Sequence, residues 1–169
     1  MKNIAAIALL VLSFTSCKTY QLPPDDKEAI TKTLNDWHNA AADVKFDTYF
    51  SLMTDDAIFI GTDPTENWNK EAFKTYSKPH FDKGKAWNFT TLERNIFLSE
   101  DGKTAWFDEL LDTQMKICRG SGVLNKENGK WKIAHYVLSI AIPNDNTNEV
   151  VKLKTKFDDV IIQKLKAKN

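Results

Sequence analysis

The chain has 169 residues, of which 42% are hydrophobic and 27% charged, the composition of an ordinary globular protein. Its 23 basic and 23 acidic residues give a formal net charge of zero, and no basic block precedes the C-terminal segment, so a nucleic-acid-binding role is not supported. The sequence has no G-x-G-x-x-G, Walker A or G-x-S-x-G motif, and its three histidines lack metal-ligand spacing. No cofactor and no metal are therefore expected.

A short apolar run at the N-terminus predicts export. It spans residues 4–14 after Lys2, roughly half the length of a membrane-spanning helix, which is typical of a cleavable signal over residues 1–16. Small residues precede Cys17, and this arrangement resembles the lipobox of bacterial lipoproteins. The resemblance implies lipid attachment at Cys17, a tether over residues 17–24, and a cell-envelope protein anchored to a membrane and facing the periplasm. The alternative is an ordinary signal peptide with an incidental cysteine.

Helical spacing dominates the first half of the remaining chain. Apolar residues three and four apart predict a first helix through Ile30, Leu34, Trp37 and Ala41, and a short second helix over residues 46–53. The run 57–60 predicts a strand. A third helix is predicted over residues 69–77, ended by Pro79.

From residue 85 the apolar pattern changes to period two. It predicts strands up to Leu98 and over residues 104–114, 115–124 and 131–142, with hairpin signals at Asp101-Gly102 and Asn128-Gly129. Strands joined by such short turns are antiparallel. Helices followed by an antiparallel meander predict one α+β domain over residues 25–143.

The tail, residues 144–169, predicts one amphipathic helix with a lysine-rich polar face. Packing of this helix on its own domain is the favoured interpretation. Pairing with a second subunit and a position on a membrane surface are the alternatives.

Several short motifs, in their order and spacing, resemble the SnoaL-like branch of the nuclear transport factor 2 (NTF2-like) superfamily. They are residues 59–64 with Glu66, 105–107, 119–122 and 129–135. The resemblance implies an NTF2-like, cystatin-like cone, in which N-terminal helices close a strongly bent antiparallel sheet around a cavity. It also implies frequent homodimers through the outer sheet face, and activities that range from isomerases and cyclases to catalytically silent binding modules.

A polar cluster is expected inside this cone. Alternation places either Asp108 or Glu109 on an apolar face, and a slip of one residue would exchange them. Arg119 on the next strand is the candidate ion-pair partner, and the resemblance favours a cavity-facing His135. The alternatives are a solvent-facing Asp108–Arg119 pair and a histidine satisfied within the core.

Aromatic residues supply the remaining site candidates. The candidates for the pocket walls are Trp37, Tyr49, Phe59, Trp68, Trp87 and Trp106, although an aromatic residue of this kind is more often part of the core than a ligand contact. Asp63 and Glu66 resemble residues at the mouth of the cone. The catalytic candidates are Asp108, His135 and Tyr49, and Cys118 is expected to be a buried structural thiol.

The leading functional interpretation is a membrane-anchored domain that binds a small, partly apolar molecule in its cone. A proton-transfer isomerase or hydrolase-like enzyme in the same cavity is one alternative, and a protein–protein interaction subunit of an envelope complex is the other. An inward carboxylate free of arginine would favour the enzyme, because it could accept a proton. An arginine-clamped carboxylate would favour the binding protein.

Overall fold

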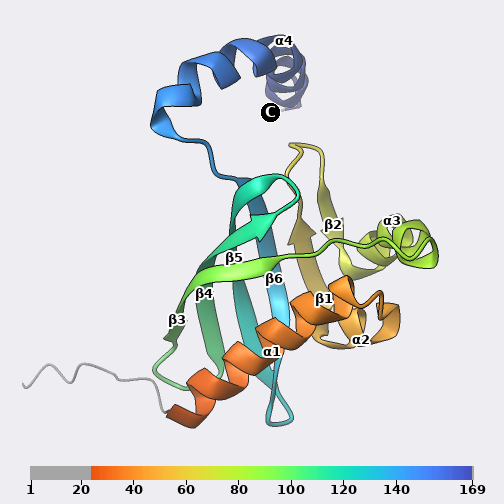
Figure 1. Cartoon of the computed structure of the whole chain (residues 1–169), viewed down its shortest axis with the longest axis vertical. Helices are drawn as coiled ribbons and strands as arrows, with labels where there is room; N and C mark the ends of the chain where they lie inside the picture. Colours follow the sequence, from red (N-terminus) through yellow and green to blue (C-terminus); the bar gives the residue numbers. More distant parts are fainter. Residues whose placement is uncertain (1–23, 169) are drawn as a thin grey trace, which may run out of the picture.

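The computed structural model describes residues 24–168 (Figure 1). The predicted signal segment, Cys17 and the tether up to residue 23 lie outside this range. Within residues 24–168, no helix combines the length and apolar character needed to cross a membrane.

The helices and strands follow the predicted order, with one additional strand. The elements are α1 Pro24–Ala42, α2 Phe46–Ser51, β1 Met53–Ile60, β2 Asn67–Asn69, α3 Lys70–Asp82, β3 Thr90–Leu98, β4 Thr104–Thr113, β5 Lys116–Glu127, β6 Lys130–Ile140, the 3₁₀ turn η1 Asn144–Asn146 and α4 Thr147–Lys166. The additional strand is the short β2.

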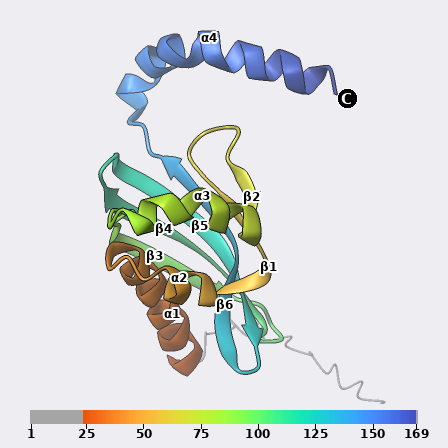
Figure 2. The same ribbon diagram turned by 90° about the vertical axis from the view of Figure 1, so that its right-hand side faces the viewer.

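The strands form a single six-stranded sheet in the order β2-β1-β6-β5-β4-β3. Strands β3 to β6 are antiparallel neighbours, as the hairpin signals predict, whereas β1 pairs parallel to β6. Figures 1 and 2 show the sheet strongly curved, with α1, α2 and α3 along one side of it. The predicted α+β, cystatin-like cone is confirmed.

The core lies between these helices and the inner face of the sheet. Helix α1 contributes Ile30, Leu34 and Trp37, all buried, at the predicted spacing. Two glycines of β5 make room for large side chains opposite them. A Cβ at Gly120 would lie 2.3 Å from the Tyr136 hydroxyl, and one at Gly122 would lie 2.8 Å from the Phe107 ring.

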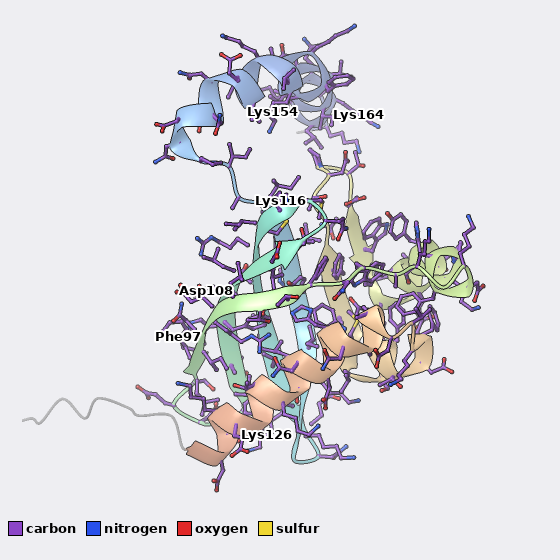
Figure 3. All side chains as sticks on the ribbon, viewed as in Figure 1. Phe97, Asp108, Lys116, Lys126, Lys154 and Lys164 are labelled. Carbon is purple, nitrogen blue, oxygen red and sulfur yellow. The ribbon has the colours of Figure 1, made fainter. Side chains whose placement is uncertain are left out.

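An ion pair fixes the start of α1 against the β5–β6 hairpin. Asp26 accepts hydrogen bonds from Lys126 Nζ (2.6 Å) and from the Trp131 indole N–H (3.1 Å). The hydrogen bond from Lys126 lowers the pKa of Asp26 below its usual value. Figure 3 shows Lys126 beside the lower end of α1, where this contact joins the helix to the hairpin.

The prediction that Pro79 ends the third helix is wrong, because α3 continues to Asp82. Proline removes one backbone hydrogen bond and crowds the preceding turn. The continuation is stabilised by Phe81, which is buried against the rings of Phe46, Tyr49 and Trp87. Burial of this aromatic side chain offsets the cost of the proline.

Helix α4 departs from the favoured expectation as well. It has no buried residue, so the expectation that it packs on its own domain is wrong. Figure 2 shows it crossing above the β1–β2 loop, separated from the sheet by the connection after β6. A shallow groove between Pro64 and Asp158, Ile161, Ile162 and Leu165 marks where it faces the domain.

Candidate functional site

A β-bulge in β6 decides which side chains of this strand enter the cone. Ile133 pairs with Leu124, and His135 with Val123, so Ala134 is an extra residue in the ladder. Strict alternation predicts that Ile133 and His135 share a face. Because of the bulge, Tyr136 and Leu138 point inward instead, and His135 lies on the outer face.

The expected polar cluster of Asp108, Arg119 and His135 is therefore absent from the interior. Asp108 does pair with Arg119, whose Nη1 lies 3.8 Å from Asp108 Oδ1. Both side chains are, however, substantially exposed on the outer sheet face. Figure 3 shows Asp108 near Phe97, at the side of the molecule away from α2 and α3. Of the two alternatives for Asp108, the solvent-facing pair is the one found. Trp106 lies on the same face and stacks on Phe97.

The inward carboxylate of β4 is Glu109, whose side chain is 0% exposed. Its Oε1 lies 2.8 Å from His38 Nε2 and accepts a hydrogen bond from the Tyr136 hydroxyl at 3.1 Å. Its Oε2 accepts one from Arg94 Nε at 2.8 Å, and Arg94 Nη2 lies 2.7 Å away. An ionised carboxylate only accepts hydrogen bonds, so His38 Nε2 must carry the proton it shares with Glu109.

Arg94 is itself held by neutral partners. Its Nη1 donates to Asn35 Oδ1 at 2.8 Å, and its Nη2 donates to Thr91 Oγ1 at 2.9 Å. The four side chains His38, Arg94, Glu109 and Tyr136, which we call the buried polar cluster, thus link α1 with β3, β4 and β6.

The electrostatics of the buried polar cluster keep Glu109 ionised. Burial alone would raise the pKa of this carboxyl. The hydrogen bond and charge of His38, together with the charge and hydrogen bonds of Arg94, outweigh burial and lower the pKa. Burial and the neighbouring Glu109 charge raise the pKa of Tyr136 well above its usual value. At neutral pH, Glu109 is an anion already saturated with donors, which makes it a poor general base.

An aromatic pocket of about 190 Å³ opens nearby, at the end of the cone toward the β1–β2 loop and the β4–β5 turn. Its apolar lining consists of Phe59, Trp68, Phe73, Tyr76, Trp87, Phe89, Met115 and Leu138. Phe73 is the centre of this wall, since the rings of Phe59 and Trp68 lie nearly parallel to it, at 4.0 and 5.6 Å between centroids. None of the residues of the buried polar cluster lines this pocket.

The polar groups of the pocket are Thr62, Glu66, Gln114 and the Tyr76 hydroxyl. Glu66 folds back over its own loop, and its Oε2 accepts a hydrogen bond from the Asp63 N–H at 3.2 Å. A Cβ at Gly61 would lie 2.1 Å from that oxygen, so a glycine is needed for this position of the carboxylate. Partial burial and the charge of Glu66 raise the pKa of Tyr76. Asp63 caps the turn by accepting from the Thr65 N–H at 2.8 Å.

The predicted wall residues divide into three groups. Phe59, Trp68 and Trp87 line the pocket. Trp37 and Tyr49 are fully buried behind it, where their rings stack at 4.9 Å, and neither Trp37 Nε1 nor the Tyr49 hydroxyl meets hydrogen-bond geometry with any group in the described residues. Burial raises the pKa of Tyr49 well above its usual value, although the indole of the neighbouring Trp87 opposes this in part. Trp106 lies outside, as described above.

The catalytic candidates Tyr49 and Asp108 are not brought together, because Tyr49 lies inside the cone and Asp108 lies outside it. Cys118 is a buried free thiol, as expected. Within residues 24–168 no group of three or more His, Cys, Asp or Glu side chains is placed to hold a metal ion.

Three members of the buried polar cluster were not predicted from the sequence, although two left a signal. His38 follows Leu34 by four residues, which places it on the inward side of α1. Arg94 shares the alternation of Ile96 and Leu98, both buried. The third, Tyr136, left none, because only the bulge at Ala134 turns it inward.

Residues 30–143 match the family model described as "SnoaL-like domain". No curated protein matches the chain. Among solved structures, it is similar to an NTF2-like protein of unknown function from Pseudomonas putida KT2440, with a TM-score of 0.62 and 13% identity over 75% of this chain and 94% of that one. An NTF2-like protein from Cytophaga hutchinsonii gives a TM-score of 0.57 and 17% identity, over 68% of this chain and 98% of the other.

A protein of unknown function with a cystatin-like fold, from Nostoc punctiforme, is similar at a TM-score of 0.59 and 13% identity, covering 72% of this chain and 96% of its own. At these identities, the similarity to solved structures concerns the fold alone.

Proposed function

This chain belongs to the SnoaL-like domain family, and from that premise we propose that it is a binding protein for a small molecule with a single flat ring. The observation that carries the proposal is the aromatic pocket of about 190 Å³ with polar groups at its rim. A cavity of about 150 Å³ lined by apolar side chains is large enough for benzene. The volume here therefore suits one ring with a small substituent.

The walls favour an aromatic ring over an aliphatic one. Phe59, Phe73 and Trp68 are close to parallel, which suits an offset-stacked guest. At the rim, the Glu66 carboxylate favours a substituent that donates a hydrogen bond or carries positive charge, and it disfavours an anion. A ring with an amine or hydroxyl group fits this chemistry better than a ring with a carboxylate.

Binding without catalysis is favoured by the state of Glu109. An isomerase needs a carboxylate that can take up a proton next to its substrate. Glu109 is clamped by Arg94, its pKa is lowered, and it does not line the pocket. Attachment to a membrane through Cys17 is part of the proposal and is supported by the sequence alone.

The experiment is calorimetric titration of the purified chain with four probes: benzylamine, phenol, benzoate and cyclohexylamine. Benzylamine should bind more tightly than benzoate, because of Glu66, and more tightly than cyclohexylamine, because of ring stacking. Trp68→Leu should weaken benzylamine binding by roughly two- to tenfold, since one stacked aromatic contact contributes about 0.5–1.5 kcal/mol.

The matched control is His135→Ala. His135 lies on the outer face, so this variant should bind as the parent does, whereas a cavity-facing histidine would make binding weaker. Absence of binding for all four probes, or equal binding by the parent and Trp68→Leu, would refute the proposal.

A further inference from the structure

Helix α4 presents an apolar stripe that is largely exposed. Val150, Leu153, Phe157 and Val160 follow one another at spacings of three, four and three residues, and Lys164 continues the series. Leu153 is 76% exposed, Phe157 71% and Val160 65%. This spacing is that of the a and d positions of a helix–helix seam.

The stripe is a different side of α4 from the one that faces the domain. The groove at Pro64 is lined by Asp158, Ile161, Ile162 and Leu165. At about 100° per residue, this group is centred roughly a third of a turn from the stripe. The stripe therefore stays open even where α4 approaches its own domain.

A contiguous apolar stripe of this kind is typical of an interaction surface. Isolated helices are marginal in water, and most helical stability in proteins comes from packing of an apolar face. Leu153, Phe157 and Val160 also adjoin one another, whereas apolar residues scattered singly on a surface need no explanation.

We propose that the stripe is the interface with a second copy of this chain, packed as an antiparallel pair of α4 helices. At roughly 150–200 Å² for each fully exposed side chain, Leu153, Phe157 and Val160 expose on the order of 400 Å² per copy. Burial on both copies, with the aliphatic stems of the flanking lysines, reaches about 1,000 Å², the lower bound for a specific interface. Because the two stripes together only just reach this bound, the interface has to include the stripes of both copies.

Charge selects the antiparallel orientation. A parallel pair in register sets Lys164 beside Lys164 of the partner subunit, inside the seam. An antiparallel pair centred on Phe157 sets Lys164 opposite Val150 of the partner subunit and next to Glu149 of the partner subunit, because 149 and 164 lie nearly equally far from 157. The orientation thus replaces a like-charge contact with an ion pair.

A membrane surface fits this helix less well. A lipid-facing side of α4 would have to include both the stripe and the neighbouring Ile161, Ile162 and Leu165. Lys154 and Asp158, which pair at 3.0 Å, interrupt this apolar surface. Figure 1 shows α4 at the end of the molecule opposite the start of α1, to which any N-terminal anchor would connect.

The test is the mass of the purified full-length chain by sedimentation equilibrium. The parent should be a dimer at micromolar concentration, and Phe157→Glu should have the mass of one chain under the same conditions. Gln163→Glu adds the same charge to the polar side of α4 and should remain a dimer. Circular dichroism of both variants establishes whether the domain is folded.

Charge reversal tests the orientation. Lys164→Glu should weaken the dimer by about tenfold, because it would meet Glu149 of the partner subunit, and Glu149→Lys combined with Lys164→Glu should restore it. In a parallel pair the second substitution would bring no recovery.

Three results would overturn the proposal. The parent could be a monomer throughout. Trp106→Glu could dissociate the dimer while Phe157→Glu does not, which would place the interface on the outer sheet face. A monomeric parent could also bind vesicles of phosphatidylglycerol and phosphatidylcholine, with loss of binding in Phe157→Glu, which would assign the stripe to lipid.

Discussion

Replacing Arg94 by Met isolates what the buried polar cluster contributes to stability. Methionine keeps a long unbranched stem but removes the guanidinium that lies 2.8 Å (Nε) and 2.7 Å (Nη2) from Glu109 Oε2. Glu109 is then left fully buried, with only His38 and Tyr136 as donors, both on Oε1. Its second oxygen loses its hydrogen-bonding partner.

The expected cost is large. Removal of one partner from a buried ion pair costs about 3–5 kcal/mol of unfolding free energy, and the loss here is expected near the lower end because His38 still compensates part of the Glu109 charge. A domain of this size is stable by about 5–15 kcal/mol, so Arg94→Met should remain folded but close to its limit. Adding Glu109→Gln should recover part of the loss, because the glutamine removes the buried charge and still accepts from Tyr136.

Urea denaturation followed by tryptophan fluorescence measures these differences, at equal m-values for all variants. The double variant should be more stable than Arg94→Met alone, which means a coupling of roughly 1–3 kcal/mol between the two sites. A cost below about 1 kcal/mol for Arg94→Met, or strictly additive effects, would show that Arg94 does not compensate a buried Glu109 charge.

Two further outcomes follow from the same interior. Gly120→Ala should cost about 1–3 kcal/mol of unfolding free energy, because its Cβ would meet the Tyr136 hydroxyl at 2.3 Å and Glu109 Cγ at 3.0 Å. Gly61→Ala should cost less, since only the movable Glu66 side chain obstructs its Cβ. Thermal unfolding of the two variants measures this difference. Because the pKa of Glu109 is lower in the folded chain, its ionised carboxylate stabilises the fold fully at pH values above the unfolded pKa of about 4.3. This contribution is lost as the pH falls through the folded pKa. Glu109→Gln should therefore flatten the acid limb of melting temperature against pH, and parallel limbs would contradict this.

The fold could be predicted from the sequence where local signals agreed with tertiary packing. The helical spacing of Ile30, Leu34 and Trp37 predicts α1. The turn signals at Gly102 and Gly129, both of which have positive φ, predict the hairpins of the meander. Pro79 was misleading because a local breaker was overridden by burial of Phe81. The parallel pairing of β1 with β6 has no local signature, since it depends on contacts far apart in the chain.

The site was harder to predict, because single residues decide it. The ambiguity between Asp108 and Glu109 is inherent to a period of two, and only the register of β4 in the sheet resolves it. The extra residue at Ala134 moved His135 outside and Tyr136 inside. Phe59, Trp68 and Trp87 were predicted as pocket walls and line the pocket, but nothing in their local sequence distinguished them from the buried Trp37 and Tyr49.

The parallel pairing of β1 with β6 has a consequence for how the chain reaches its native state. Ile58 pairs with His135, so a strand from the first third of the chain finds its neighbour only after nearly all of the meander has been synthesised. Closing so long a segment costs conformational entropy before the contacts between β1 and β6 can form. Folds rich in such long-range pairings therefore form slowly. Until then one edge of β1 lacks a partner, and during this interval the nascent chain is most vulnerable to association with other chains.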